Sequence, residues 1–594
     1  MSAANQSTLL SRFLAWRAKN IPKRQFILIL SVIIGFLTGL ASVTLKNTTH
    51  FIQEQIQHGV FTEYFNPYYF AFPILGIMIT VFVKKYILRD KVKEPIPSTL
   101  LAISRKNGLI SYKRMYSYMV SSIFTVGFGG SAGLEGPGVG TGSAIGANIG
   151  RMVHLNYKSR LLLICCASSA AIASMFNAPI AGIIFTIEIF SLDLTFSSLI
   201  PLLLSSASGA VTSLFLEGND YLLRFKSIES FEVHDVPFYL LLGVLTALTS
   251  VYFNNVFFWV ERKFSRFENF RYRMLIGGVL LGCLILLVPP LYGEGYSTIK
   301  HLLDDDLNAI VADSLFAGFL VEQPWMILSL LCGLVLLKAF ATSLTISGGG
   351  AGGVFAPSLF TGATLGYVFS ASLNTLPFFS IPISNFVLVG MAGLMAGVLH
   401  APFTAVFMIA EITGGYELIV PLMMVSAISF LVARGIKPHS IYTEQLAKRG
   451  DLLTHNKDQV VLTLLQMEDV IETNFKSVKP DMSLGELVKV ISQSNRNLFP
   501  VVNDDQELVG VLTLDDIRHL MFDQELYPKT HVRELMNPPP EILNRGESME
   551  EVMKKFTKSG AWNLPVVDEG IYMGFISKSK MFSVYRNKLL EFSD

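Results

Sequence analysis

Long apolar runs follow one another over the first three quarters of the chain. The first covers residues 26–45, and the others centre on residues 67–88, 114–126, 158–191, 196–216, 237–260, 273–290, 325–346, 358–376, 383–412 and 417–434. About 20 apolar residues suffice for a helix to span a bilayer. The pattern therefore predicts an all-α, multi-pass membrane domain over residues 26–445, in which the longest runs, 158–191 and 383–412, each contain two helices.

The segments that interrupt these runs recur at matching positions. Gly133-Leu-Glu135-Gly-Pro137 is matched 220 residues later by Gly353-Val-Phe-Ala-Pro357. Asn177-Ala-Pro179 is matched 223 residues later by His400-Ala-Pro402, and each proline is followed nine residues on by a glutamate. Breaks at corresponding positions are typical of transporters made of two inverted repeats, which hold their site at the repeat interface.

The chain after residue 445 has short apolar runs and frequent charges. A linker over 446–468 leads to two copies of one pattern, at 469–525 and 530–588. In each copy a helical stretch, expected at Leu484–Ser492 and Met549–Ser559, precedes β-branched runs that flank a turn. The sequence therefore predicts a tandem of two small α/β units after the membrane domain.

Charge separates these regions and orients the chain. Only 16% of the residues are charged, against about 25% in soluble proteins. Residues 1–25 contain five basic residues and no acid, so we expect this segment, and with it the tail, on the cytoplasmic side of the membrane. The net charge of +1 gives no reason to expect nucleic acid as a partner. The sequence shows no nucleophile with a neighbouring base, so we do not expect an enzyme.

One break carries a single acid among many glycines. Ten of the 24 residues over 127–150 are glycine, and Glu135 is their only acid. Non-helical backbone at membrane depth is tolerated only where protein buries it or where it lines a cavity. An ionisable residue in such a place is a functional-site hypothesis by default.

Helices that start near Pro137 and Pro357 would aim free N–H groups and positive dipole ends at the two breaks. Two such helix starts form a site for a small, weakly hydrated anion, which can leave again because no full positive charge holds it. An ionised Glu135 would compete with the anion, and a protonated one would withdraw. Glu135 is therefore predicted to gate the pathway. The alternative is an acid that only stabilises a helix N-terminus.

Together these motifs resemble the CLC family of chloride channels and chloride/proton exchangers, over nearly the whole chain. The resemblance rests on residues 133–137, 353–357, 177–182 and the tail. It implies a homodimer in which each subunit has its own pore, with Glu135 as the external gating glutamate and with no required cofactor or metal. It also implies an anion site made of Gly133, Leu134, Glu135, Gly136, Val354, Phe355, Ala356 and Tyr442. For Tyr442 the alternative is a tyrosine that anchors a membrane interface.

The chain departs from the family pattern in three places. Lys93-Glu94-Pro95-Ile96-Pro97 stands where the family has Gly-Ser-Gly-Ile-Pro, so no filter serine is assigned. Leu134 stands where Arg or Lys is usual. Ile189 stands where many exchangers have an internal glutamate, and an apolar side chain cannot pass on a proton. The sequence therefore favours passive chloride conduction slightly, with chloride/proton antiport as the alternative.

The tail resembles a pair of CBS domains. In that family a Gly-x-x-Thr-x-x-Asp pattern binds the ribose of an adenine nucleotide, and Thr513 and Asp516 match it. The second copy has Ser577 but carries Lys580 where the acid belongs. The resemblance implies a nucleotide site at Thr513, Asp516 and Ser577. The alternative is a packing module that stiffens the dimer.

Two readings from other classes compete with anion transport. A CBS-bearing divalent-cation transporter would need clustered intramembrane acids, whereas Glu135, Glu188 and Glu411 are scattered in the sequence. A membrane-tethered nucleotide sensor would not explain the repeated breaks. The sequence therefore predicts an integral membrane protein that moves chloride and similar small anions, with protons as a second candidate ion.

Overall fold

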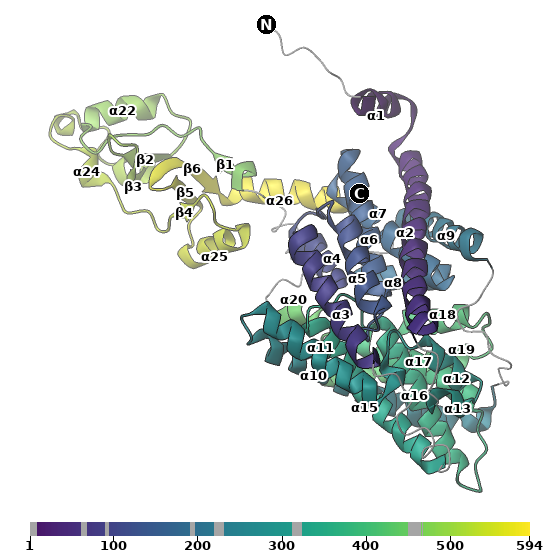
Figure 1. The fold of residues 1–594 in the computed structure, drawn as a ribbon. Coiled ribbons are helices and arrows are strands. Elements are labelled where there is room, and N and C mark those ends of the chain that lie inside the picture. The colour runs from purple at the N-terminus through teal and green to yellow at the C-terminus, as the bar shows by residue number, and fades with distance from the viewer. Residues whose placement is uncertain are drawn as a thin grey trace. The chain divides into compact units, whose positions relative to one another are not determined.

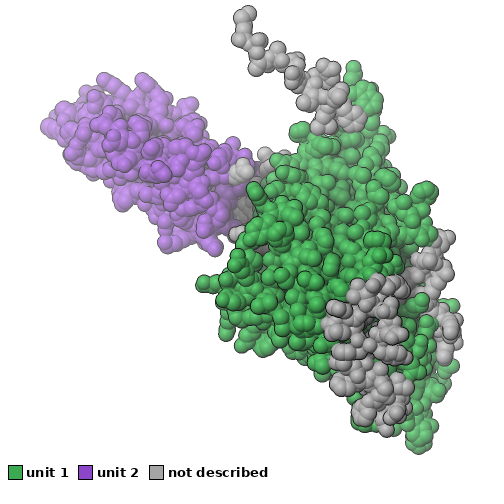
Figure 2. Space-filling view, in the orientation of Figure 1, with its two compact units in different colours: residues 1–452 green, residues 453–594 purple. Residues whose placement is uncertain are grey.

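The computed structural model describes residues 9–60, 68–89, 94–190, 196–218, 231–311, 324–448, 465 and 467–593. The chain forms two compact units, residues 1–452 and 453–594 (Figure 2). Most of the expected linker over 446–468 lies outside the described residues. So does Lys93, the first residue of the motif at 93–97 that differs from the family pattern. Each unit is described by itself.

The first unit is helical (Figure 1). Its first half contains α1 (Leu9–Asn20), α2 (Lys23–Val60), α3 (Tyr68–Phe82, continued by a π turn at Val83–Ile87), α4 (Pro95–Arg105), α5 (Arg114–Gly127), α6 (Glu135–Met152), α7 (Tyr157–Phe176), α8 (Pro179–Phe190) and α9 (Phe196–Glu217). Its second half contains α10 (Val236–Ser265), α11 (Phe270–Leu287), α12 (Tyr296–Leu303), α13 (Leu307–Val311), α15 (Pro324–Ser347), α16 (Phe355–Asn374), α17 (Ile383–Leu399), α18 (Pro402–Ile412), α19 (Ile419–Ile436) and α20 (Glu444–Lys448).

Within the described residues, eight helices are long and apolar enough to cross a membrane, and α8, α17 and α18 are shorter apolar helices. The multi-pass helical prediction is therefore confirmed. The two longest apolar runs do contain two helices each, α7 with α8 and α17 with α18.

The repeated Ala-Pro motif ends one helix and starts the next in both halves. Asn177 (φ 53°) and His400 (φ 57°) close α7 and α17 in the left-handed conformation. Pro179 and Pro402 then occupy the first position of α8 and α18, where a missing N–H costs no hydrogen bond. The repeat in the sequence is thus a repeat of local structure.

The glutamates at the ends of these short helices tie the halves together. Glu188 of α8 accepts hydrogen bonds from the backbone N–H groups of Phe403 (3.0 Å) and Thr404 (2.7 Å) at the start of α18, and from the Thr404 hydroxyl (2.5 Å). Glu411 of α18 accepts from Ile180 (3.0 Å) and Ala181 (2.7 Å) at the start of α8. Each carboxylate caps the helix of the other half, which satisfies free N–H groups and the positive end of the helix dipole.

The second unit contains two small sheets. Strands β2 (Leu498–Val502) and β3 (Leu508–Thr513) form an antiparallel pair. The other sheet has the order β1-β6-β5-β4, from β1 (Ile471–Glu472), β6 (Ile571–Ser577), β5 (Asn563–Asp568) and β4 (Leu543–Asn544). The helices of the unit are α22 (Leu484–Ser492), α23 (Leu514–Ile517), α24 (Val532–Leu535), α25 (Met549–Ser559) and α26 (Lys578–Ser593). The predicted helices at 484–492 and 549–559 are confirmed.

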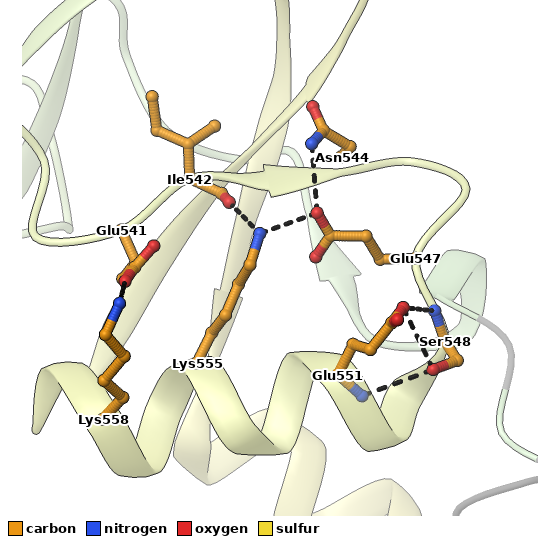
Figure 3. A network of polar contacts seen from close by, with 8 residues as sticks. All are labelled: Glu541, Ile542, Asn544, Glu547, Ser548, Glu551, Lys555 and Lys558. Carbon is orange, nitrogen blue, oxygen red and sulfur yellow. Dashed lines mark hydrogen bonds and ion pairs between the residues drawn. The ribbon is translucent and has the colours of Figure 1, made fainter.

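The two copies in this unit exchange contacts. Strand β1 lies at the start of the first copy but pairs with β6 of the second, and Glu507 of the first copy bridges Ile571 of the second. Polar contacts hold α25 against the segment around β4 (Figure 3). Lys555 donates to the Ile542 carbonyl and to Glu547, both at 2.7 Å, and Lys558 pairs with Glu541 at 2.8 Å. The α/β prediction for the tail is confirmed. The two copies also share strand pairing, which a simple tandem of separate units would not.

Candidate functional site

The two predicted helix starts meet. Helix α6 begins at Glu135 and helix α16 at Phe355, and neither N-cap residue, Leu134 or Val354, caps its helix with a side chain. Between them, Gly133 N–H donates to the Gly353 carbonyl at 2.9 Å, and Gly353 N–H donates to the Gly133 carbonyl at 2.7 Å. This antiparallel bridge brings two positive helix ends to one place, which is the geometry that binds anions.

Both glycines of the bridge are needed for this close approach. A Cβ atom on Gly353 would stand 3.0 Å from the amide nitrogen of Gly136. A Cβ atom on Gly133 would stand 2.0 Å from Glu135 Oε2. The breaks are glycine-rich because side chains would separate the two backbones or displace the carboxylate.

Glu135 lies at this junction, where its side chain is almost fully enclosed, with 3% exposure. Its Oε1 accepts a hydrogen bond from the Tyr296 hydroxyl at 2.6 Å. Its Oε2 has no partner in hydrogen-bonding geometry within the described structure. The backbone N–H groups of Glu135 and Ala356 nevertheless lie close enough to act on the carboxylate. The carboxylate therefore occupies the place where the helix starts favour a negative charge.

Phe355 and Ala356 are on the other side of the junction. The Phe355 ring is buried and packs against Phe176 (centroids 5.4 Å apart) and Phe185 (6.5 Å). The start of α16 therefore offers backbone N–H groups in an apolar surrounding, with no side-chain charge of its own. Such a surrounding suits a weakly hydrated anion better than a metal cation.

A buried polar network extends from Leu134. The Leu134 N–H donates to Glu294 Oε1 at 3.2 Å, and Glu294 Oε2 lies 3.5 Å from His50 Nε2. Lys338 is fully buried and donates to the Gly293 carbonyl at 3.1 Å, where its charge acts on Glu294. The side chains of Glu294, His50 and Lys338 thus place ionisable groups beside a site whose own break lacks the basic residue usual before Glu135.

Tyr442 is the predicted site residue most distant in sequence. Its side chain is 4% exposed, and its hydroxyl has no hydrogen-bond partner in the described part of the chain. Both Glu135 and Glu94 act electrostatically on that hydroxyl. The fold therefore brings Tyr442 into the neighbourhood of Glu135, and it adds Glu94, which the sequence analysis noted only as a departure.

Four residues at or beside this site were not predicted: Tyr296, Glu294, Lys338 and His50. The sequence did carry signals for the first three. Glu294 lies in Tyr292-Gly-Glu-Gly-Tyr296, an acid between glycines in a gap between apolar runs, and Lys338 is the one charged residue of the run at 325–346. This gap has no marked counterpart elsewhere in the chain, so the repeated motifs give no indication of it.

The predicted nucleotide residues bond within their own unit. Asp516 Oδ2 accepts from the Thr513 N–H (2.7 Å) and hydroxyl (2.6 Å), and Asp516 Oδ1 accepts from Asn537 (3.1 Å). The Ser577 hydroxyl donates to Glu472 Oε1 at 2.5 Å. A nucleotide at either place would have to replace these bonds, and the nucleotide site stays a prediction.

The acids that the rival cation reading requires do not gather. Over the described ranges, no group of three or more His, Cys, Asp or Glu side chains is placed to hold a metal ion. Glu188 and Glu411 instead cap helices, as described above. The junction combines two helix starts with the Glu135 carboxylate, and Glu294 accepts a hydrogen bond from the adjoining Leu134 N–H.

Comparison with known proteins agrees with this geometry. The sequence profile of the family described as voltage gated chloride channel matches residues 75–434, and the CBS domain profile matches residues 467–523 and 532–587. The chain is 26% identical over 435 residues to the H(+)/Cl(-) exchange transporter ClcA of Vibrio cholerae, an alignment that covers 71% of this chain and 89% of that protein. It is also 26% identical to the chloride channel protein CLC-f of Arabidopsis thaliana, over 70% of this chain and 59% of that one.

Among solved structures, a eukaryotic CLC transporter has the same fold. It superposes with a TM-score of 0.60 at 16% identity, over 93% of this chain and 97% of that one. The fold and the helix-start site define an integral membrane protein of the anion-transport class. The chain belongs to the voltage-gated chloride channel (CLC) family and carries two CBS domains.

Proposed function

We propose that this protein exchanges chloride for protons across the membrane, and that Glu135 is the group that couples the two ions. The curated ClcA relatives are named as exchangers of these ions. This corrects the slight preference for passive conduction drawn from Ile189, because that residue argues only against one proton route. Passive conduction through the same site is the outcome that a negative transport experiment would support.

One observation carries the proposal. The Glu135 carboxylate lies at the meeting point of the α6 and α16 N-termini, with Oε1 bonded to Tyr296 and Oε2 unpartnered in the described structure. An anion bound to those helix starts and an ionised Glu135 would need the same space and the same N–H groups. Since only the protonated side chain carries no charge, its withdrawal is linked to uptake of a proton. Anion entry and proton uptake thereby become parts of one cycle.

The experiment is ion transport in sealed proteoliposomes. A chloride gradient should drive protons uphill with a fixed ratio of chloride to protons. The Glu135→Gln variant should keep chloride movement, lose uphill proton movement and lose the dependence of chloride flux on external pH. Chloride flux without proton movement in the wild-type protein would contradict exchange and favour conduction. Unchanged pH dependence in Glu135→Gln would contradict the role of Glu135.

The same proposal predicts that the site selects anions over cations. The amides of Val354, Phe355 and Ala356 would face the anion, so chloride and bromide should pass while sodium and potassium are excluded. A reversal potential that follows potassium rather than chloride would overturn the anion assignment.

The assembly and the orientation in the membrane belong to the same proposal. We expect a homodimer with a pore in each subunit, and an N-terminus and CBS tail in the cytoplasm. Two measurements test this: the mass of the detergent-free particle in nanodiscs, and the accessibility of cysteine labels placed in residues 1–25 and in the tail. A monomer, or labelling from the outside, would contradict it.

A further inference from the structure

A proton that reaches Glu135 from the outer side must also travel between Glu135 and the cytoplasm. The chain offers no carboxylate at Ile189, which is buried with 7% exposure in α8. Proton transfer needs a titratable group or a water chain within hydrogen-bonding reach. The question is which described side chain could supply that group.

Glu94 lies near Glu135 in space. It is the N-cap residue of α4, and the next residue, Pro95, packs directly on α6: a Cβ atom on Gly140 would stand 2.5 Å from Pro95 Cβ. Gly140 is five residues after Glu135 on α6, which corresponds to about 7.5 Å along the helix axis. Glu94 therefore lies roughly one and a half turns of α6 from the gate.

Tyr442 is within the electrostatic influence of both carboxylates. Glu94 and Glu135 each act on its hydroxyl, which is buried and lacks a hydrogen-bond partner in the described structure. A buried hydroxyl without a partner is costly, so its position calls for a ligand or water that completes its bonds. The Tyr442 hydroxyl is therefore a polar group available to both carboxylates.

Beyond Glu94, Gln445 and Glu261 continue the series. Gln445 Nε2 donates to Glu261 Oε1 at 2.7 Å, and Gln445 also lies within hydrogen-bonding reach of Glu94. The charge of Glu261 acts on Glu94. Glu261 belongs to the last turns of α10, and Gln445 to α20, which packs against α4.

The end of the molecule that holds Glu261 is strongly basic. The end of α10, the start of α11 and the segment around α20 carry Arg262, Lys263, Arg266, Arg271, Arg273, Lys437 and Lys448. Basic segments of this kind stay in the cytoplasm. In this region Arg262 and Lys437 influence each other, and Glu444 pairs with Lys437 (3.6 Å) and Lys448 (2.6 Å).

We infer that Glu94 is the inner proton-carrying residue of this exchanger. It exchanges protons with the cytoplasm through Glu261 and water, while Gln445 holds Glu261 in place by its hydrogen bond, and it is connected to Glu135 by way of the Tyr442 hydroxyl or water. In the inward step, protonated Glu135 gives one proton toward Glu94, and Glu94 releases one to the cytoplasm. Each carboxylate gains and loses one proton per cycle, so no other reactant is needed. The inference rests on the proposed exchange function.

The test compares chloride and proton fluxes of full-length variants in the same proteoliposomes. Glu94→Gln should slow uphill proton movement by about 100-fold, the typical contribution of one positioned proton-transfer group. Its chloride flux should remain, which also reports that the variant is folded. Glu94→Asp should restore proton movement in part. Glu444→Gln, a carboxylate at the same end that is paired with lysines, is the matched control and should keep the wild-type ratio.

The outcomes separate the two proposals. If the wild-type protein moves chloride without protons, exchange and this inference both fall. If the wild type exchanges and Glu94→Gln keeps the same proton ratio, exchange stands and Glu94 is not on the route. If Glu94→Gln stops chloride as well and Glu94→Asp restores only chloride, Glu94 serves the anion path or the fold, and the inference is wrong.

Discussion

The two breaks that meet at the junction have the same backbone and different side chains. Leu134 and Val354 are both helical in conformation, with φ of −88° and −96°, and each precedes the first residue of a helix. That first residue is Glu135 in one half and Phe355 in the other. The backbone of both halves supplies the electrostatic field, whereas only one half has a carboxylate as the first residue of its helix. If Glu135 acts as we propose, this difference between the two helix starts makes the site respond to pH.

The tail shows the same relation at smaller scale. Thr513 and Ser577 each end a strand and precede a helix, and the acid three residues later, Asp516 in the first copy, is Lys580 in the second. In the second copy, Glu472 from β1 bonds the serine instead. The second copy thus has no acid at the matching position, and its serine bonds a carboxylate from a neighbouring strand instead.

We expect the largest effect from a variant that gives both helix starts the same first residue. Phe355→Glu would place a carboxylate at the start of α16 as well, and two charges about 4 Å apart repel by roughly 4 kcal/mol at an intermediate dielectric. We expect chloride flux at neutral pH to fall by more than about tenfold, the change that 1.4 kcal/mol produces, and to recover in part as the pH is lowered.

Phe355→Gln is the matched control for that variant, because it removes the packing against Phe176 and Phe185 without adding charge. If both variants lose the same flux at every pH, packing rather than charge limits the site. The idea that the difference in charge between the two helix starts controls chloride flux would then be wrong.

The reciprocal caps allow a comparison of stability. Glu188→Ala removes three hydrogen bonds at the start of α18, and Glu411→Ala removes two at the start of α8. Loss of a helix cap costs about 1–2 kcal/mol, so both variants should unfold at lower temperature, with the larger loss for Glu188→Ala. Thermal unfolding in one detergent measures this. Equal, negligible losses would show that the caps do not hold the halves together.

The difference between the tail copies predicts where nucleotide binds. If the acid matters, full-length protein should bind ATP or AMP through Thr513 and Asp516, and Asp516→Asn should weaken binding by about tenfold, the equivalent of one charged hydrogen bond. Lys580→Asp, which gives the second copy its missing acid, is the complementary variant. Calorimetry that detects no binding to the wild type at millimolar nucleotide would favour the packing role.

The smallest expected effect concerns acid stability of the tail. Burial alone would raise the pKa of Glu472, but hydrogen bonds from Ser577 and Arg496 and the Arg496 charge lower it overall. A lowered pKa stabilises the fold above the ordinary range of glutamate, near pH 4, and the contribution disappears as the pH falls through the lowered value. Glu472→Gln should therefore increase hydrogen exchange in β1 and β6 at pH 7 by a few-fold and have no effect at the most acidic pH.

Asp505→Asn is the control for Glu472→Gln, since the Asp505 side chain is exposed. A similar increase in exchange for both variants would mean that net charge, and not the Glu472 bonds, sets the effect.

Sequence periodicity predicted the helices well where composition and geometry coincide. The lengths of the runs at 158–191 and 383–412 indicated two helices in each, and the structure divides them at Asn177 and His400. Sequence periodicity underestimated α2, which runs over Lys23–Val60 although the apolar run ends at residue 45. Hydropathy reports the part of a helix that contacts lipid or core, and the polar end of α2 has no such signal.

The site was predictable where it repeats and hidden where it does not. Glu135 and the two Gly/Pro breaks follow from the duplicated motif. Tyr296 and Glu294 come from a connection with no partner in the other half, and only folding brings them to Glu135. The bridge between β1 and β6 was hidden for a similar reason, because a strand of two residues carries almost no pattern.

The paired hydrogen bonds between Gly133 and Gly353 have a mechanical consequence. To slide or part the two halves at this point would leave two donors and two acceptors unsatisfied away from water, at about 1–3 kcal/mol for each group. Rotation of the Glu135 side chain breaks its hydrogen bond with Tyr296 and leaves the Gly133–Gly353 pair intact. The movement that costs the least free energy is therefore that of a side chain and not of a helix. The Glu135 side chain can move while the backbone around it stays in place.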